Sequence, residues 1–265
     1  MTEKYAIDFF VFLMGAAVGS FLNVCIVRMP HMQSVVYPGS HCVHCKKPIL
    51  WHDNVPLLSY LFLLGKCRHC KKKISFRYFT VELVTAVLFL IFYRHFDFNI
   101  ILWPYLLMVC GFIIATFVDM KHRIIPDEIS VGGIVVGIIL SAIIPELHDT
   151  TSWTASLWRS LLGVLIGGGA IYAMGLLGDF IFKKESMGGG DVKLLAMMGA
   201  FMGWKMAILT FFIAPLFGAI AGIIVKIKTK ESVIPYGPFL VIGALISLFW
   251  GESIFQWILS GYGLN

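Results

Sequence analysis

The chain has 265 residues, of which 58% are hydrophobic and 14% are charged, and its mean hydropathy is +0.85. This composition excludes a soluble domain of that length and predicts a protein that crosses a membrane several times. The net charge of +6 at neutral pH fits basic residues that lie beside anionic lipid headgroups of the bilayer. We therefore expect no nucleic-acid partner.

Apolar runs along the chain predict at least six transmembrane helices. A bilayer core of about 30 Å needs about 20 apolar residues of helix. The first run is followed by Arg28 and not by a small-residue cleavage site, so we expect a retained span rather than a signal peptide. The six runs lie near residues 9–27, 79–93, 98–118, 129–145, 157–182 and 238–258.

The stretch from residue 192 to residue 225 is too long for one span and short for two. Cytoplasmic loops collect lysine and arginine, and eight spans with an outside N-terminus place most of the 21 such residues on one side. A single span here would move Lys226, Lys228 and Lys230 to the opposite side. We therefore predict two short helices that turn near Lys205, in an all-α polytopic membrane protein of about eight transmembrane helices.

Two cysteine pairs lie in the polar segment between the first two spans: Cys42-x-x-Cys45 and Cys67-x-x-Cys70. Each pair can point two thiolates at one ion, and together they complete a closed, tetrahedral site of the structural zinc type. Bound Zn²⁺ would stabilise a loop that has too few apolar residues for a core. Disulfides or redox dithiols are the alternative, which a cytoplasmic location disfavours.

Two aspartates lie at the ends of apolar runs and are the candidate catalytic residues. Asp119 closes the run near residues 98–118, and Asp191 directly precedes the run that begins at Val192. A carboxylate at such a position is costly to keep, which indicates a function. In the eight-span topology both face the cytoplasm. Two adjacent carboxylates can share one proton, so that one activates water and the other polarises a peptide carbonyl, as in an aspartyl protease.

The glycines Gly188, Gly189 and Gly190 precede Asp191. Their backbone can adopt positive φ and let an extended substrate lie against it, so we expect them to support substrate binding. The alternative is a flexible break between helices, with Asp191 interacting favourably with a helix N-terminus.

Asp127 is a rival to Asp119, but it follows Pro126 at the start of a predicted helix, where an acidic residue suits the N-terminus. We expect Asp127 and Lys193 to support the site rather than to catalyse. Glu82 and Asp179 also lie in apolar runs and are further candidate functional carboxylates.

Six short motifs occur in an order and spacing that together are highly specific. They are Gly19-Ser20-Phe21-Leu22-Asn23-Val24, Asp53-Asn54-Val55-Pro56 inside the four-cysteine loop, Ser75-Phe76-Arg77-Tyr78, Asp119-Met120-Lys121-His122-Arg123-Ile124-Ile125-Pro126-Asp127, Met187-Gly188-Gly189-Gly190-Asp191-Val192-Lys193-Leu194-Leu195 and Pro235-Tyr236-Gly237-Pro238-Phe239. With these motifs the chain resembles the bacterial type IV prepilin peptidases over nearly its whole length.

The resemblance implies a bifunctional enzyme. It implies that type IV prepilins and pseudopilins lose their leader peptide at the cytoplasmic membrane face, after a glycine. The new N-terminal residue, often Phe, is then methylated with S-adenosylmethionine. It also implies that the four-cysteine loop accompanies the methyltransferase activity. An apolar substrate helix would bind between spans, where small residues such as Gly199 and Gly203 permit close approach. No glycine-rich nucleotide-binding fingerprint is visible, so the sequence leaves the cofactor-binding residues unknown.

The expected organisation is a first transmembrane span at residues 1–28, a cytoplasmic tetracysteine loop at 29–77, and a transmembrane peptidase core at 78–265. The expected location is the bacterial cytoplasmic (inner) membrane, as a multi-pass protein whose active site faces the cytoplasm. The sequence leaves the oligomeric state open.

Two alternatives remain. The first is a broader-specificity intramembrane aspartyl protease without methyltransferase activity, against which the tetracysteine loop argues. The second is a non-enzymatic, zinc-containing membrane transporter. A transporter predicts acidic residues near the bilayer midplane and an internal repeat, whereas Asp119 and Asp191 map to one membrane face and no convincing repeat is seen.

Overall fold

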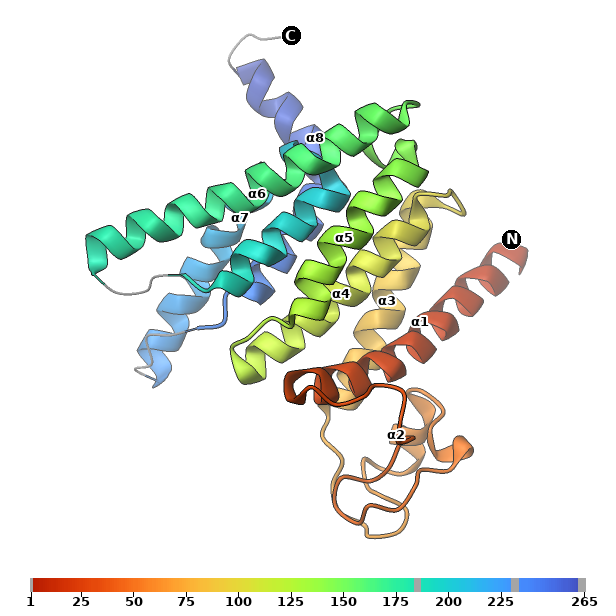
Figure 1. The fold of residues 1–265 in the computed structure, drawn as a ribbon. Coiled ribbons are helices and arrows are strands. Elements are labelled where there is room, and N and C mark those ends of the chain that lie inside the picture. The colour runs from red at the N-terminus through yellow and green to blue at the C-terminus, as the bar shows by residue number, and fades with distance from the viewer. Residues whose placement is uncertain (1, 184–186, 230–233, 262–265) are drawn as a thin grey trace. The chain divides into compact units, whose positions relative to one another are not determined.

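The computed structural model describes residues 2–183, 187–229 and 234–261, and this part of the chain is helical with no strand. Lys230, which we assign to a cytoplasmic loop, lies outside the described residues. The long helices are α1 (Thr2–Arg28), α3 (Arg77–Phe96), α4 (Leu102–His122), α5 (Asp127–Ile143), α6 (Trp153–Phe182), α7 (Gly189–Thr229) and α8 (Gly237–Gly261) (Figure 1). The short helical turns are η1 (Met29–His31), η2 (Trp51–Asp53), α2 (Leu58–Phe62) and η3 (Pro145–His148).

Six of these helices are long and apolar enough to cross a membrane: α1, α3, α4, α6, α7 and α8. The remaining long helix, α5, has 17 residues and is also apolar. Helix α7 has 41 residues and is interrupted at Gly203, whose φ of 75° and ψ of 172° are not helical. Counting α5 and both halves of α7, the described residues hold eight apolar helical segments, which agrees with the predicted architecture. The interruption lies close to Lys205, where we expect the turn.

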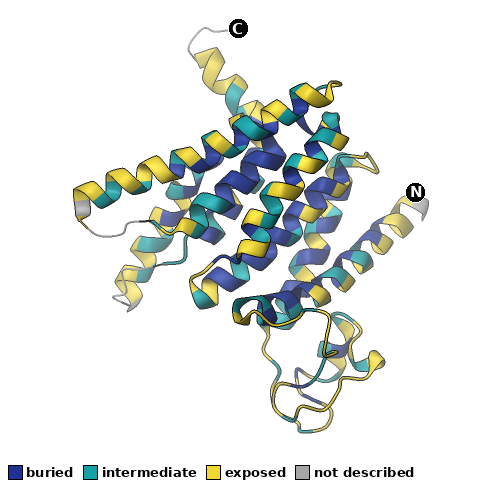
Figure 2. Cartoon of the chain, in the orientation of Figure 1, coloured by how far each residue is buried: buried dark blue, intermediate teal, exposed yellow. Residues whose placement is uncertain are grey.

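Large apolar side chains remain exposed along the long helices, as expected for surfaces that face lipid. In α6 these include Leu165, Tyr172, Leu177 and Phe180, which are 69%, 59%, 63% and 84% exposed. Figure 2 shows exposed positions along most of the length of α6. Exposed apolar patches of this extent are rare on soluble proteins, so the structure supports the multi-pass membrane class.

The chain divides into two compact units, residues 1–114 and 115–265. In the first unit α1 and α3 lie side by side (Figure 1). Gly15 and Gly19 make this close packing possible. A Cβ on Gly15 would lie 2.8 Å from the Ala86 Cα of α3, and a Cβ on Gly19 would lie 2.8 Å from the Glu82 Cα. Near the other end of the pair, Arg94 of α3 forms a 2.7 Å ion pair with Asp8 of α1.

In the second unit α6 and α7 cross with their backbones in contact. A Cβ on Gly163 would clash with the Gly199 carbonyl oxygen, and a Cβ on Gly199 would clash with the Gly163 carbonyl oxygen. Small residues at a crossing give membrane helices this close packing. The expectation that Gly199 is available to a substrate helix is therefore wrong, because α6 already occupies that surface. Gly203 likewise packs against His148.

The break in α7 is stabilised by side chains from neighbouring elements. The Ala200 carbonyl precedes the break, accepts a hydrogen bond from Ser160 Oγ at 2.9 Å, and lies 3.2 Å from His148 Nε2. Burial lowers the pKa of His148 to about 4, so its ring is neutral at physiological pH and donates from Nε2. These contacts satisfy a buried carbonyl that would otherwise be costly.

Candidate active site

Asp119 lies in the last turns of α4, and its side chain is 6% exposed. Its Oδ2 accepts a hydrogen bond from the backbone N–H of Gly237 at 2.9 Å, across 118 residues of sequence. The carboxyl group also interacts electrostatically with Arg123, in the turn that follows α4. A buried carboxylate is therefore held by one amide donor and one nearby cation.

Gly237 is the first residue of α8, and its N–H is the donor that this helix end leaves free. The first N–H groups of a helix have no partner within the helix. Pro238 has no N–H, and the amides of the next two residues donate to the Tyr236 carbonyl at 3.0 and 3.2 Å. The N–H of Gly237 therefore points at Asp119. A Cβ on Gly237 would lie 2.9 Å from Asp119 Oδ2, so a larger residue would have to displace the carboxyl group.

Asp191 lies in the first turn of α7 and is half-buried. Its N–H donates to the Gly188 carbonyl at 3.1 Å, and the Gly188 backbone hydrogen-bonds its carboxyl group. Asp119 lies close enough to interact electrostatically with Asp191. The second unit thus brings together the two aspartates that the sequence singled out, one from a helix end and one from a helix start.

Tyr236 lies beside these two aspartates, and no role for it was predicted from the sequence. Its half-buried side chain interacts electrostatically with Asp191. Burial, and then the charge of Asp191, raise the pKa of Tyr236 to about 12, so the phenol keeps its proton. Its ring packs near Gly218. The Pro235–Phe239 motif was the available signal for Tyr236 and Gly237, but the motif alone does not reveal the contact with Asp119.

The glycines before Asp191 are open to solvent on one side. Gly188 and Gly189 are exposed, and a Cβ on Gly189 would meet nothing within 4 Å. Gly190 packs against Ile125, which a Cβ would approach to 3.2 Å. The expected positive φ is not found, because none of the three has one. Because they have no side chain, these glycines instead let their own backbone lie close to Ile125 and to the Asp191 carboxyl group.

Asp127 and Lys193 form an ion pair, with Nζ 2.7 Å from Oδ1. Asp127 is the first residue of α5, directly after Pro126, so the predicted helix start is confirmed. Both side chains are exposed, at 66% and 43%. Exposed ion pairs contribute little to stability, and this one joins the beginnings of α5 and α7 at the solvent surface.

The four cysteines of the loop form a single cluster in the first unit. The sulfur atoms of Cys42, Cys45, Cys67 and Cys70 all lie within 4.8 Å of one another, and those of Cys42 and Cys70 are 3.9 Å apart. Four thiolates around zinc at about 2.3 Å require sulfur–sulfur separations of about 3.8 Å. The donor set and its spacing therefore fit one tetrahedral metal ion.

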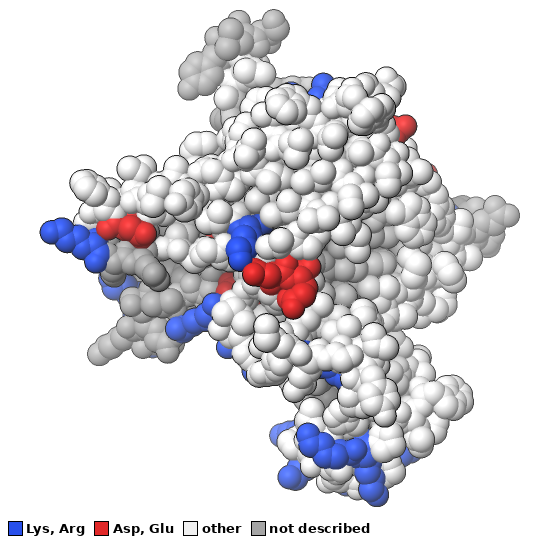
Figure 3. Space-filling view, in the orientation of Figure 1, with Lys and Arg blue, Asp and Glu red and all other residues white. Residues whose placement is uncertain are grey.

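The two cysteine turns are built alike, and their sequences, Cys-Val-His-Cys-Lys-Lys and Cys-Arg-His-Cys-Lys-Lys, differ only at Val43 and Arg68. In the first turn the Lys46 N–H donates to the Cys42 carbonyl at 2.9 Å, and in the second turn the Lys71 N–H donates to the Cys67 carbonyl at 3.0 Å. Both lysines have a φ near +60°, at 59° and 58°. Basic side chains gather on this loop, which appears at the bottom of Figure 3.

Asp53, in the same loop, accepts two hydrogen bonds from Arg68 Nε and one of 2.6 Å from Nη2. These bonds hold the pKa of Asp53 below its usual range. Because the carboxylate is so paired, its role is to fix the loop rather than to exchange protons.

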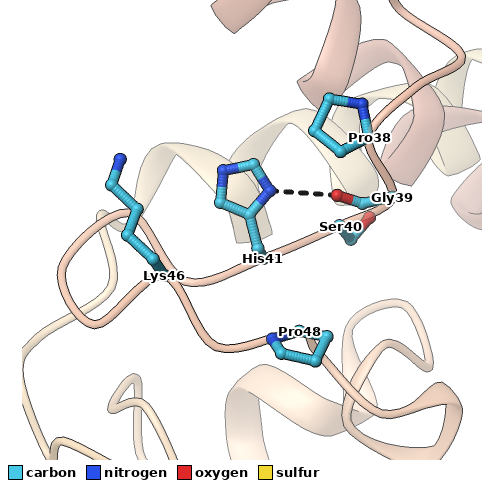
Figure 4. Close-up of a pocket in the computed structure, with 6 residues that line it drawn as sticks. All are labelled: Pro38, Gly39, Ser40, His41, Lys46 and Pro48. Carbon is cyan, nitrogen blue, oxygen red and sulfur yellow. Dashed lines mark hydrogen bonds between the residues drawn. The ribbon is translucent and has the colours of Figure 1, made fainter.

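A pocket of about 360 Å³ lies beside the first cysteine turn (Figure 4). His41 Nδ1 there lies 3.0 Å from the Gly39 carbonyl oxygen. The lining contains no carboxylate, so the pocket does not provide the chemistry of a peptidase. Its residues are Pro38, Gly39, Ser40, His41, Lys46 and Pro48.

Two family models match the chain in order: the bacterial peptidase A24 N-terminal domain over residues 13–96 and the type IV leader peptidase family over residues 106–223. A Myxococcus xanthus protein named prepilin leader peptidase/N-methyltransferase is 37% identical over 223 residues, covering 84% of this chain and 64% of the relative. Relatives with the same name from Legionella pneumophila and Pseudomonas aeruginosa are 36% and 35% identical. They cover 94% and 91% of this chain, and 93% and 90% of their own lengths. No solved structure matches. From these similarities, the chain belongs to the type IV leader peptidase family.

Proposed function

We propose that this protein is a membrane aspartyl endopeptidase that removes the leader peptide from type IV prepilins and pseudopilins and then methylates the new N-terminal residue. The observation that carries the peptidase assignment is the convergence of Asp119 and Asp191 at one helix-end site. The names of the relatives support the second activity and the substrate class.

The paired carboxylates provide the chemistry of peptide hydrolysis. Two adjacent carboxyl groups cannot both ionise easily, so one carries the proton. The ionised group accepts a proton from water as the water oxygen bonds to the scissile carbonyl carbon. The protonated group donates a hydrogen bond to the carbonyl oxygen. Proton transfer to the amide nitrogen then lets the C–N bond break. Gly188 and Gly189 would provide backbone for an extended substrate segment.

In this proposal the metal and the methyl donor have separate roles. The four cysteines hold structural Zn²⁺, because a closed set of thiolates leaves no position for a reacting molecule. S-adenosylmethionine, when bound, supplies an electrophilic methyl group for the new N-terminal amine. The loop at 29–77 accompanies this second activity, and the peptidase core lies within residues 78–265.

We place the enzyme in the bacterial cytoplasmic membrane, with Asp119 and Asp191 facing the cytoplasm. The positive-inside rule supports this orientation, since the four-cysteine loop carries many of the basic residues. Those residues also suit contact with anionic lipid headgroups. The transporter alternative is not favoured, because the aspartates lie at helix ends and not in the middle of spans.

The proposal is tested with purified prepilin and detergent-solubilised enzyme in the presence of S-adenosylmethionine, with products identified by mass. Asp119→Asn and Asp191→Asn should each lower the cleavage rate by about 100- to 10,000-fold, since each removes one proton-transfer group. Asp149→Asn, at an exposed aspartate that follows η3, is the matched control and should cleave at close to the wild-type rate. Normal cleavage by either of the first two folded variants would remove that aspartate from the mechanism.

A further inference from the structure

Glu82 is a buried carboxylate in the first unit for which the peptidase mechanism has no use. It lies in the second turn of α3 and is 9% exposed. Its Oε2 accepts the Leu57 N–H at 2.7 Å, and its carboxyl group also hydrogen-bonds the Ser20 side chain. Among the described residues no lysine or arginine forms an ion pair with it. A buried carboxylate without a cation costs several kcal/mol, and inside a membrane protein it indicates function.

Three other carboxylates of the first unit do not share this property. Asp8 is paired with Arg94. Asp53 is paired with Arg68. Asp97 lies at the end of α3 and is exposed to solvent. Among Asp8, Asp53, Glu82 and Asp97, Glu82 is therefore the one acid that is both buried and free of a cationic partner.

Asn23 of α1 provides a buried, unsatisfied acceptor on the helix surface that faces α3. It is 2% exposed, its Nδ2 donates to the Tyr78 carbonyl at 2.9 Å, and its Oδ1 is buried with no hydrogen-bond partner. Tyr78 lies one helical turn before Glu82. Gly19 lies one turn before Asn23 and packs on the Glu82 Cα. Asn23 and Glu82 thus lie on the facing sides of α1 and α3, about one turn of 5.4 Å apart along the helices.

The Glu82 carboxyl group, which two neutral donors already contact, and the unpartnered Asn23 Oδ1 form a buried site with no cationic partner among the described residues. A primary ammonium group matches it, because it offers three N–H donors and a positive charge. The proposed methyltransferase activity acts on such a group, the α-amino terminus that cleavage of the leader peptide generates. An α-amino group has a pKa of about 8, so at neutral pH it is mostly protonated and has no lone pair with which to attack a methyl carbon.

We propose that Glu82 and Asn23 bind the α-amino group of the cleaved substrate, and that Glu82 is the general base for its methylation. One N–H proton moves to the Glu82 carboxylate. The freed nitrogen lone pair forms the N–C bond to the methyl group of a sulfonium donor, as the S–C bond breaks and its electron pair stays on sulfur. The product is a methylammonium, and Glu82 returns its proton to solvent. The inference rests on the proposed N-methyltransferase function and is independent of the aspartate pair.

The four-cysteine loop contributes to this site through Leu57. The Leu57 backbone has a φ of 62° and a ψ of −52°, a conformation that a non-glycine residue rarely adopts, and in it the N–H points at Glu82. A metal held by the cysteines would fix the loop and hence this donor. This gives a physical reason for a structural metal to accompany methyl transfer.

The test uses the full-length enzyme and a pilin peptide that already lacks its leader, so that methylation is measured without cleavage. Glu82→Gln keeps the shape and an acceptor for the Leu57 N–H but removes the base. At pH 7 about one tenth of an amine of pKa about 8 is unprotonated, so the methylation rate should fall by about tenfold, and it should rise by about fivefold between pH 7 and pH 8 as the amine loses its proton unaided. Prepilin cleavage should stay near the wild-type rate. Asp97→Asn is the matched control and should leave both activities unchanged.

Binding provides a readout that needs no turnover. The wild type should bind the peptide with a free α-amine about tenfold more tightly than the N-acetylated peptide, and Glu82→Gln should remove that difference. Asn23→Ala should raise the KM for the amine peptide about tenfold with a smaller change in kcat.

Three results would overturn the inference. They are normal methylation by Glu82→Gln, a loss of methylation that is equal at every pH, and equal binding of the amine and acetylated peptides to the wild type. A wild type that cleaves but never methylates would overturn the proposed methyltransferase function itself. Loss of cleavage in the aspartate variants leaves this test unaffected.

Discussion

The contact between Gly237 and Asp119 makes a sharp prediction about the peptidase site. In Gly237→Ala the new Cβ would lie 2.9 Å from Asp119 Oδ2 and 3.4 Å from Cγ. Both separations are below or at the limit of ordinary contact, so the carboxyl group must move away from the amide. The change therefore removes a hydrogen bond of 2.9 Å to a buried carboxylate and displaces one member of the pair.

The size of the expected loss in cleavage rate follows from the free energy that such a hydrogen bond contributes. A hydrogen bond to a charged group contributes about 1.5–3 kcal/mol. If that contribution is lost in the transition state, the rate of cleavage falls by about 10- to 150-fold, because 1.36 kcal/mol corresponds to a factor of ten. The displacement of Asp119 adds to this, so we expect at least a tenfold loss in kcat.

The assay is the initial rate of prepilin cleavage by purified enzyme, together with methylation of a pre-cleaved peptide as a check that the protein is folded. Gly243→Ala is the matched control, because its Cβ would lie 3.2 Å from the Ala214 nitrogen, which tests tight packing elsewhere in α8. Wild-type cleavage by Gly237→Ala would refute the role of the amide. An equal loss of cleavage rate in Gly243→Ala would show that disturbed packing of α8, and not the lost hydrogen bond to Asp119, lowers the rate.

Three further predictions concern the metal, the surface ion pair and the interrupted helix. Cys67→Ser removes one of four thiolates, so metal content measured by mass spectrometry should fall to background, and methylation should fall with it. Asp127→Asn and Lys193→Gln remove an exposed ion pair worth about 0–1 kcal/mol, so melting temperature and cleavage should change little; a large loss would mean that the pair acts in catalysis. Burial lowers the pKa of His148 to about 4, whereas the unfolded value is about 6.5, so the unfolded chain takes up a proton first. The stability that His148 contributes is therefore fully present above about pH 6.5 and is lost as the pH falls toward 4. The melting temperature of His148→Gln should depend less on pH over this range, and an unchanged dependence would contradict the burial argument.

Much of this protein follows from local patterns in the sequence. Apolar runs of the right length predict spans whatever their neighbours are, because a segment in hydrocarbon must satisfy its own backbone hydrogen bonds. Two Cys-x-x-Cys turns predict a cluster because each turn already pairs two thiols. Asp119 and Asp191 are conspicuous because a carboxylate beside an apolar run is costly. The cysteine cluster is confirmed, and the structure brings the two aspartates together; their catalytic role stays a prediction.

The tertiary structure decided the contacts that connect distant parts of the chain. The Gly237 N–H donates to Asp119 because α8 begins at Gly237, Pro238 has no N–H, and the next two N–H groups donate to the Tyr236 carbonyl instead. The expected substrate surface at Gly199 is lost because α6 packs there, and the glycines before Asp191 have no positive φ. A sequence pattern states what environment each residue needs, since that depends on its own chemistry. Which donor or helix provides that environment depends on how helix ends pack, and this is fixed only in the folded chain.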